Sequence, residues 1–417
     1  MRSNVEDPGL VFGVIGDLHM RGPEDEEAVR QALAALRAQG VAAVVVTGDL
    51  ISGGAGFDRF LPFAHAWNAV FPPDCGVECL VVLGERDIAG GDVAEAWRTA
   101  FGEVYAPREV REIGGCCFVL CREPDASVGT GSQDAQPHQP PTFFVRHFPL
   151  SADATKLVPP GTIFLTGHTC TPLTDPRTIC PCNGGVMVDA SSLLHVRAPG
   201  GRENALAEGL PPEAAEWRHM PDISREAEKA RHAWVVRVDA HSMTFRRMDL
   251  VFGRVLADDV VIPFATDTVN CQLPTTNPPA FPEGAEVLIE EGTGKTMAGK
   301  IERQLTVRFP SARTPSRAFD YAVTVRYAEA DLVKIAVEKR VYAYGLFRPE
   351  DEEIVSCVFG FDELPWDVEL DFEIVPRTAF GGAGKVLYAR GYIESQEARA
   401  KRLKKERKAA LEKVVQT

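Results

Sequence analysis

The chain has 417 residues, enough for two or three domains at about 100–200 residues per domain. A hydrophobic share of 45% and a charged share of 25% are typical of a globular protein and exclude a disordered or fibrous chain. The longest apolar runs are far shorter than the ~18 residues of a membrane span. The N-terminus lacks a secretory-signal pattern, and ten cysteines are too few for a disulfide scaffold. We therefore expect no membrane span, reduced thiols and a cytoplasmic location.

Charge is distributed unevenly along the chain. The formal net charge is −14, whereas residues 395–417 hold eight Lys or Arg and three Glu, a net +5, which leaves −14 − 5 = −19 for the rest. A body this acidic argues against a nucleic acid partner, because nucleic acid binding relies on cationic contacts to phosphates. Residues 395–417 are expected to form a short basic helix.

The first 190 residues alternate between strand and helix patterns. Apolar runs predict strands, and segments with a helical period at 24–39, 57–70 and 92–101 separate the first of them. Buried strands separated by helices indicate an α/β layer fold, whose sites form at the C-terminal ends of strands. We expect this domain to span residues 1–265. The predicted strands are Leu10–Ile15, Val41–Val46, Val77–Leu83, Thr142–Arg146, Thr162–Thr166 and Val186–Asp189.

The pattern changes after residue 265. A proline-rich segment at 266–283 predicts a linker. Beyond it, six segments alternate polar and apolar residues with a period of two and without helices between them, which indicates an all-β sandwich domain at 284–394. The basic helix at 395–417 follows. Either the β domain or this helix could bind a protein partner.

Polar side chains that bind metals follow the apolar strands of the first domain. A single Asp-x-His triplet occurs often by chance, but five acidic or histidine clusters, each at a strand end, are a strong signal. They are Asp17-Leu18-His19, Gly48-Asp49, Gly84-Glu85-Arg86-Asp87, His147 and Gly167-His168-Thr169-Cys170. Four further histidines, His195, His219, His232 and His241, lie outside these clusters and are assigned no site role.

In type and order, these clusters resemble the motifs of the calcineurin-like metallophosphoesterase family: D-x-H, G-D, G-N-H-D/E, H and G-H-x-H. The resemblance implies a four-layer α/β sandwich with two metal ions at the strand ends. It also implies that Asp17 and His19 hold the first metal, Asp49 bridges, and His147 and His168 hold the second. A shared carboxylate offsets the repulsion between two cations. Two metals can hold a bridging hydroxide and clamp both oxygens of a phosphoryl transfer, so no protein nucleophile is needed.

Three residues depart from the family motif. Glu85 replaces Asn and still offers a metal an oxygen, although it adds a negative charge. Arg86 replaces the motif His; it cannot act as a general acid at neutral pH but can clamp phosphate oxygens. Cys170 replaces the last His, and its thiolate would favour Zn or Fe over Mn. Arg86 and Asp87 are the predicted catalytic residues.

The sequence therefore supports two functions. The first is a metal-dependent phosphoesterase that hydrolyses a phosphomonoester or phosphodiester, with a small-molecule phosphate ester as substrate and two divalent or trivalent ions (Mn, Fe or Zn) as cofactors. The second is a catalytically degenerate relative that acts as a binding or scaffold module. The predicted metal ligands are Asp17, His19, Asp49, Glu85, His147, His168 and Cys170.

Overall fold

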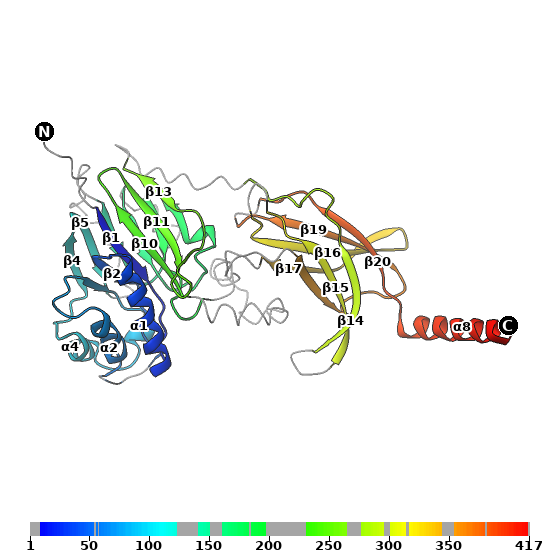
Figure 1. The fold of residues 1–417 in the computed structure, drawn as a ribbon, viewed down its shortest axis with the longest axis horizontal. Coiled ribbons are helices and arrows are strands. Elements are labelled where there is room, and N and C mark those ends of the chain that lie inside the picture. Colours follow the sequence, from blue (N-terminus) through cyan, green and yellow to red (C-terminus); the bar gives the residue numbers. More distant parts are fainter. Residues whose placement is uncertain are drawn as a thin grey trace. The chain divides into compact units, whose positions relative to one another are not determined.

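The computed structural model describes residues 9–53, 56, 58–122, 141–150, 161–182, 185–196, 231–264, 277–295, 301–313, 317–343, 354–379 and 382–415. The chain divides into two compact units, one built mainly from residues 1–275 and the other mainly from residues 276–417. Figure 1 shows the first as a layered α/β unit and the second as strands followed by a helix. Within the described part of the chain, no helix is both long and apolar enough to cross a membrane.

The first unit contains two sheets. In the first, β1 pairs in parallel with β2 and antiparallel with β10, so the sheet is mixed. The strand order is β12-β11-β10-β1-β2-β3, with β13 paired to β11. The strands are β1 (Leu10–Ile15), β2 (Ala43–Val46), β3 (Glu78–Val81), β10 (His232–Val238), β11 (Ser242–Asp249), β12 (Arg254–Val255) and β13 (Val260–Pro263).

The second sheet has the order β4-β5-β6-β7-β9-β8 and is parallel at its centre. Its strands are β4 (Arg108–Ile113), β5 (Cys116–Cys121), β6 (Thr142–Val145), β7 (Ile163–Thr166), β8 (Ile179–Cys182) and β9 (Gly185–Asp189). The short 3₁₀ turn η1 (Pro176–Thr178) precedes β8. The predicted strands of the α/β region are thus present, but the sequence did not indicate how they pair.

Three helices cover the outer face of the first sheet: α1 (Pro23–Ala38), α2 (Leu61–Val70) and α4 (Val93–Phe101). Helix α1 has Pro23 in its first turn and three acidic residues near its N-terminus, which favours helix initiation there. It buries Val29, Leu33 and Leu36, which recur on one helical face. A four-residue helix, α3 (Glu85–Ile88), follows β3.

Two apolar cores hold these layers together. One lies between the helices and the first sheet, and the other fills the space between the two sheets with residues such as Phe12, Phe118 and Phe143. Helices, first sheet and second sheet are therefore three successive layers. The fourth layer of the predicted sandwich is not among the described elements.

The second unit contains two antiparallel sheets around one core. One sheet has the order β14-β15-β18 and the other the order β17-β16-β19-β20. Alternate residues of both sheets are buried in the shared core, as expected for a sandwich. The strands are β14 (Leu288–Lys295), β15 (Ile301–Pro310), β16 (Asp320–Glu329), β17 (Leu332–Tyr342), β18 (Ile354–Gly360), β19 (Glu369–Arg377) and β20 (Leu387–Tyr392).

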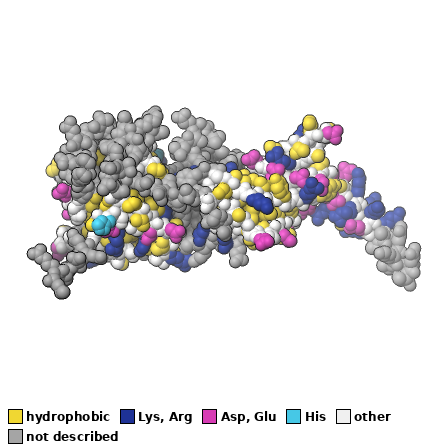
Figure 2. All heavy atoms as spheres, turned by 90° about the horizontal axis from the view of Figure 1, so that it is seen from above, with side chains coloured by type: hydrophobic (Ala, Val, Ile, Leu, Met, Phe, Trp, Pro, Cys, Tyr) yellow, Lys and Arg dark blue, Asp and Glu magenta, His cyan; other side chains and the backbone are white. Residues whose placement is uncertain are grey.

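Helix α8 (Gln396–Val415) follows the second sheet. The Ser395 hydroxyl caps its first turn by accepting the Ala398 amide hydrogen at 3.1 Å. Arg402 pairs with Glu394 and Arg399 approaches Glu291. From residue 401 to 408 every side chain is exposed, and Figure 2 shows Lys and Arg side chains along this part of the helix.

Candidate metal centre

Five strand-end segments bring the predicted ligands together. The segments follow β1, β2, β3, β6 and β7, and all seven side chains fall into three overlapping groups that could hold a metal ion. Within each group, one candidate ligand atom per residue lies within 4.8 Å of the others. The groups are Asp17–His19–Cys170, Glu85–His147–His168 and Asp17–Asp49–His147.

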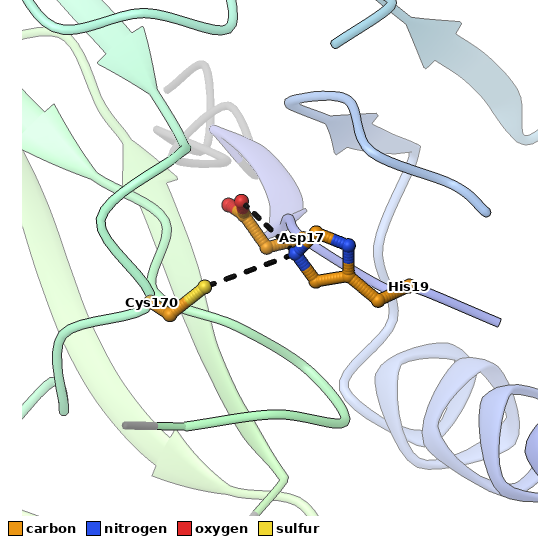
Figure 3. Close-up of side chains that lie close together, drawn as sticks. All are labelled: Asp17, His19 and Cys170. Atoms are coloured by element: carbon orange, nitrogen blue, oxygen red, sulfur yellow. Dashed lines mark hydrogen bonds and ion pairs between the residues drawn. The ribbon is translucent and has the colours of Figure 1, made fainter. Parts of the chain in front are cut away.

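The first group has the His19 imidazole at its centre. Its Nε2 lies 3.9 Å from the Cys170 Sγ and 3.8 Å from the Asp17 Oδ1. Figure 3 shows the Cys170 side chain, from the segment after β7, pointing toward the Asp17 and His19 side chains, from the segment after β1. These separations suit ligands of one ion, because bonds of about 2.0–2.3 Å to nitrogen and sulfur place tetrahedral ligands roughly 3.5 Å apart.

The second group is formed by two histidines and Glu85. The Glu85 Oε2 lies 2.8 Å from the His147 Nε2, and its Oε1 lies 3.4 Å from the His168 Nδ1. The His147 Nδ1–H donates to the Thr47 carbonyl at 2.8 Å. Metal-binding histidines commonly donate their second ring nitrogen to such a carbonyl, which leaves Nε2 directed at the site.

Asp49 lies between the two groups. Its Oδ2 is 3.7 Å from the His19 Nε2, and its Oδ1 is 3.8 Å from the His147 Nε2. The Arg86 backbone N–H donates to the same Oδ1 at 3.0 Å and orients the carboxylate. One carboxylate that faces an imidazole of each group has the geometry needed to bridge two cations.

The backbone at these ligands adopts a rare conformation. Asp17, His19, Asp49, His168 and Cys170 have φ between +46° and +76°. The left-handed region is uncommon for residues other than glycine, and such residues concentrate at functional sites because the surrounding structure must maintain them. Five of the nine non-glycine residues with positive φ in the described chain are thus predicted ligands.

The electrostatics of the site suit a cation. Burial raises the pKa of both Asp17 and Asp49, and the neighbouring carboxylates raise the pKa of Asp17 further. The Asp17 Oδ1 is buried without a hydrogen-bond partner. The Asp17 Oδ2 accepts the His168 amide hydrogen, so only Oδ1 lacks a donor. A buried charged oxygen without a donor is costly, and a multivalent cation would compensate it. The donor set of imidazoles, carboxylates and one thiolate therefore fits Zn or Fe.

Glu85 and His147 also compensate each other. Burial opposes ionisation of Glu85, but hydrogen bonds to His147 and His168 outweigh it and lower the pKa of this carboxyl. Burial likewise disfavours protonation of His147, yet Glu85 and the nearby aspartates raise its pKa to about 9. The Glu85 carboxylate and the His147 imidazole could therefore either bind a metal ion or form an ion pair with each other.

The two predicted catalytic residues occupy different environments. The Arg86 side chain is exposed, and no described residue forms an ion pair with its guanidinium. Asp87 is buried, and its carboxylate accepts the Gly84 amide hydrogen at 2.9 Å and the Ile51 amide hydrogen at 3.2 Å. Burial raises the pKa of Asp87 to about 7. This geometry favours contact with a substrate for Arg86 and positioning of the loop for Asp87.

Two residues near the site were not identified from the sequence. Asp189 ends β9, and its carboxylate accepts the hydroxyl hydrogen of Thr169, which lies between His168 and Cys170. Its signal was an acidic residue at the end of a predicted apolar strand. His195 was assigned no site role, but its ring centroid lies 5.9 Å from that of His19. Because His195 lies outside the motifs, nothing in the sequence indicated that it is close to His19.

The candidate ligand groups lie at strand ends of the α/β unit, within the part of the chain that a family model matches. Residues 10–172 match the model of the calcineurin-like phosphoesterase family, which confirms the resemblance over this part of the chain. No curated protein matches the sequence.

Several solved structures resemble part of the chain at low identity. A dimetal phosphatase from Danio rerio is 13% identical, with 62% of this chain and 100% of that chain covered and a TM-score of 0.37. A predicted phosphoesterase from Streptococcus pneumoniae TIGR4 is 15% identical, covering 61% and 97%, with a TM-score of 0.32. Vacuolar protein sorting 29 from Cryptosporidium parvum is 14% identical, covering 62% and 100%, with a TM-score of 0.34.

Proposed function

We propose that the first unit is a metal-dependent phosphoesterase that holds two metal ions and hydrolyses a phosphomonoester or phosphodiester of small-molecule size. The observation that carries this proposal is the position of Asp49 between the imidazoles of His19 and His147. Asp17, His19 and Cys170 would hold one ion, and Glu85, His147 and His168 the other. When bound, the ions would supply Lewis acidity and an activated water to a phosphate ester.

Arg86 would bind the substrate. Its side chain is exposed and forms no ion pair with the described residues, whereas its backbone N–H donates to Asp49. A guanidinium can donate two parallel hydrogen bonds to phosphate oxygens and stabilise the charge that develops on them. It cannot donate a proton at neutral pH, so Arg86 favours esters whose leaving groups depart without protonation.

Asp87 would keep this loop in place. By accepting two backbone amide hydrogens, from Gly84 and Ile51, it joins the loop after β3 to the loop after β2. The positions of Glu85 and Arg86 relative to Asp49 therefore depend on a buried carboxylate that does not itself face the substrate.

The predicted cytoplasmic location is part of this proposal. The described cysteines form no disulfide bond with one another, and the proposed compartment would keep them as thiols.

One observation favours the alternative of a degenerate binding module. The Glu85–His147 contact of 2.8 Å satisfies both side chains internally, and an Asn at position 85 would not supply this charge. In that case the second group would be an internal ion pair, and the fold would serve as a binding or scaffold module.

The experiment that separates the two functions measures metal content and ester hydrolysis together. Wild-type protein should bind about two equivalents of Zn²⁺ or Fe²⁺ and hydrolyse bis-p-nitrophenyl phosphate or p-nitrophenyl phosphate. Asp49→Asn should lose metal at both positions, with activity reduced by at least about 10³-fold because both ions share this carboxylate. Asp249→Asn is the matched control, since Asp249 is also buried but lies outside the site, where it accepts the Val251 amide hydrogen.

The outcomes distinguish the functions clearly. Wild-type metal content and activity in Asp49→Asn would refute the proposed centre. A wild-type protein that binds one metal or none and hydrolyses neither ester would establish the binding-module alternative.

A further inference from the structure

The last residue of β9, Asp189, has a buried carboxylate that contacts the segment after β7, which carries His168 and Cys170. β9 runs parallel to β7, with Asp189 opposite Thr166, so both strands end at the same edge of the sheet. Asp189 is 1% exposed. Its backbone carbonyl accepts the indole N–H of Trp234 at 2.7 Å, which anchors it to β10 of the other sheet.

The two carboxylate oxygens of Asp189 have different partners. Oδ1 accepts the backbone N–H of Ser191 at 2.8 Å, as in a local turn. Oδ2 accepts the hydroxyl of Thr169 at 2.7 Å, across twenty residues of sequence. The turn explains the first bond, whereas the second acts on the segment that follows β7.

Thr169 stands between two predicted ligands of different groups. His168 belongs to the group with Glu85 and His147, and Cys170 to the group with Asp17 and His19. Both residues have positive φ, a conformation that the surrounding structure must maintain. The Thr169 hydroxyl also accepts the Thr171 N–H at 3.2 Å, so it bridges Asp189 to the backbone on the far side of Cys170.

We propose that Asp189 is a positioning residue for both metal-ligand groups, acting through the Thr169 hydroxyl to hold His168 and Cys170 in their ligating geometry. This inference rests on the proposed function. The alternative is that Asp189 only caps the turn at Ser191 and stabilises the fold. The two roles differ at Thr169, because the capping role does not use its hydroxyl.

The test is a Co²⁺ titration of metal-free full-length protein. Thr169→Val removes the hydroxyl at nearly constant size, Asp189→Asn removes the charge, and Thr169→Ser keeps the hydroxyl. Thr178→Val is the matched control, because the buried Thr178 hydroxyl donates a bond of the same 2.7 Å length to the Asp175 carbonyl, away from the ligands. The readouts are binding stoichiometry and the thiolate-to-cobalt absorption that reports coordination by Cys170.

Thr169→Val should weaken Co²⁺ binding at both positions by about 10–100-fold, the usual effect of losing a partner that orients metal ligands. The absorption that reports Cys170 should weaken or shift with it. Thr169→Ser should restore affinity and spectrum, and Thr178→Val should match wild type. Combining Thr169→Val with Asp189→Asn should add little to Asp189→Asn alone, since both changes act on the same bond between the two side chains.

Wild-type affinity and spectrum in Thr169→Val would overturn the positioning role while leaving the proposed function intact. An equal loss in Thr178→Val would also overturn it, because the effect would then be general destabilisation. A wild-type protein that binds no Co²⁺ would overturn both the inference and the proposed function. Should Asp189→Asn not fold, Thr169→Val and its Ser counterpart still decide the outcome.

Discussion

At the scale of single residues, the sequence predicted which side chains could bind a metal better than it predicted what each side chain contacts. The motif order was sufficient to select all seven candidate ligands, and the structure places all of them in adjoining groups. The catalytic role predicted for Asp87 stays a prediction, and no role was predicted for Asp189, because a carboxylate that faces backbone amides and one that faces a cation look the same in a sequence. Only the hydrogen bonds to Gly84 and Thr169 distinguish them.

Cys170 offers the sharpest residue-scale test of the candidate centre. Cys170→His should raise the affinity for Mn²⁺ relative to Zn²⁺ by on the order of tenfold, because imidazole and carboxylate suit Mn²⁺ better than thiolate does. The backbone permits the change, since His tolerates the left-handed region that Cys170 occupies at φ +52° and that His19 already occupies. Competition between the two metals in equilibrium dialysis measures the ratio.

Cys170→Ser is the companion variant. It also removes the thiolate but offers no imidazole, so it should weaken Zn²⁺ binding without the same gain for Mn²⁺. An unchanged metal preference in both variants would mean that the Cys170 sulfur does not coordinate the metal.

At the scale of elements, periodicity predicted strands but not their neighbours. The expected Leu10–Ile15 and Thr162–Thr166 correspond closely to β1 and β7. That β1 pairs with β10, more than two hundred residues later, follows from the burial of Trp234 and Val236 between the sheets, which no local pattern encodes. Strand ends are therefore easier to predict from sequence than the sheet order that brings them together.

The loop after β3 begins with Gly84, and the structure shows why this position requires glycine. A Cβ at Gly84 would lie 2.1 Å from the Asp49 Oδ1 and 2.7 Å from the Asp49 amide nitrogen. The Gly84 backbone, with φ −97° and ψ −179°, is extended and open to any residue, so the close approach alone requires glycine. Gly84→Ala should displace Asp49, weaken Co²⁺ binding by at least about tenfold and reduce stability by about 1–3 kcal/mol through overpacking.

Gly22→Ala is the control for this substitution. Its backbone is also extended, with φ −173°, and a Cβ there meets no atom within 4 Å. Metal binding should match wild type in that variant, measured by the same titration and by thermal unfolding. Normal Co²⁺ affinity in Gly84→Ala would show that the two loops need not pack this closely to form the site.

At the scale of the whole molecule, the change in sequence pattern near residue 265 corresponds to a change in core. The described part of the α/β unit contains three apolar clusters, and the strands after residue 284 surround a fourth. The exact limits 1–265 and 284–394 stay predictions. Composition indicates a change of architecture, whereas the residue at which one domain ends depends on contacts between residues far apart in the sequence.

Because the two units have separate cores, we expect each unit to unfold independently. A substitution at Asp320 tests this, because it should destabilise only the second unit. Asp320 is 1% exposed at the start of β16, accepts a bond from the Arg377 Nε at 2.6 Å and also pairs with Arg340, so it joins β16 to both neighbouring strands. Asp320→Asn removes the charge and leaves two partly buried guanidinium groups under-compensated, at a cost of about 1–3 kcal/mol of unfolding free energy.

The measurement is urea unfolding of the full chain, monitored by hydrogen exchange of individual peptides. Only peptides after residue 284 should show a lower urea midpoint. Co²⁺ binding by the first unit should not change. A shift of equal size in peptides from β1 and β10 would show instead that the two cores unfold as one cooperative unit.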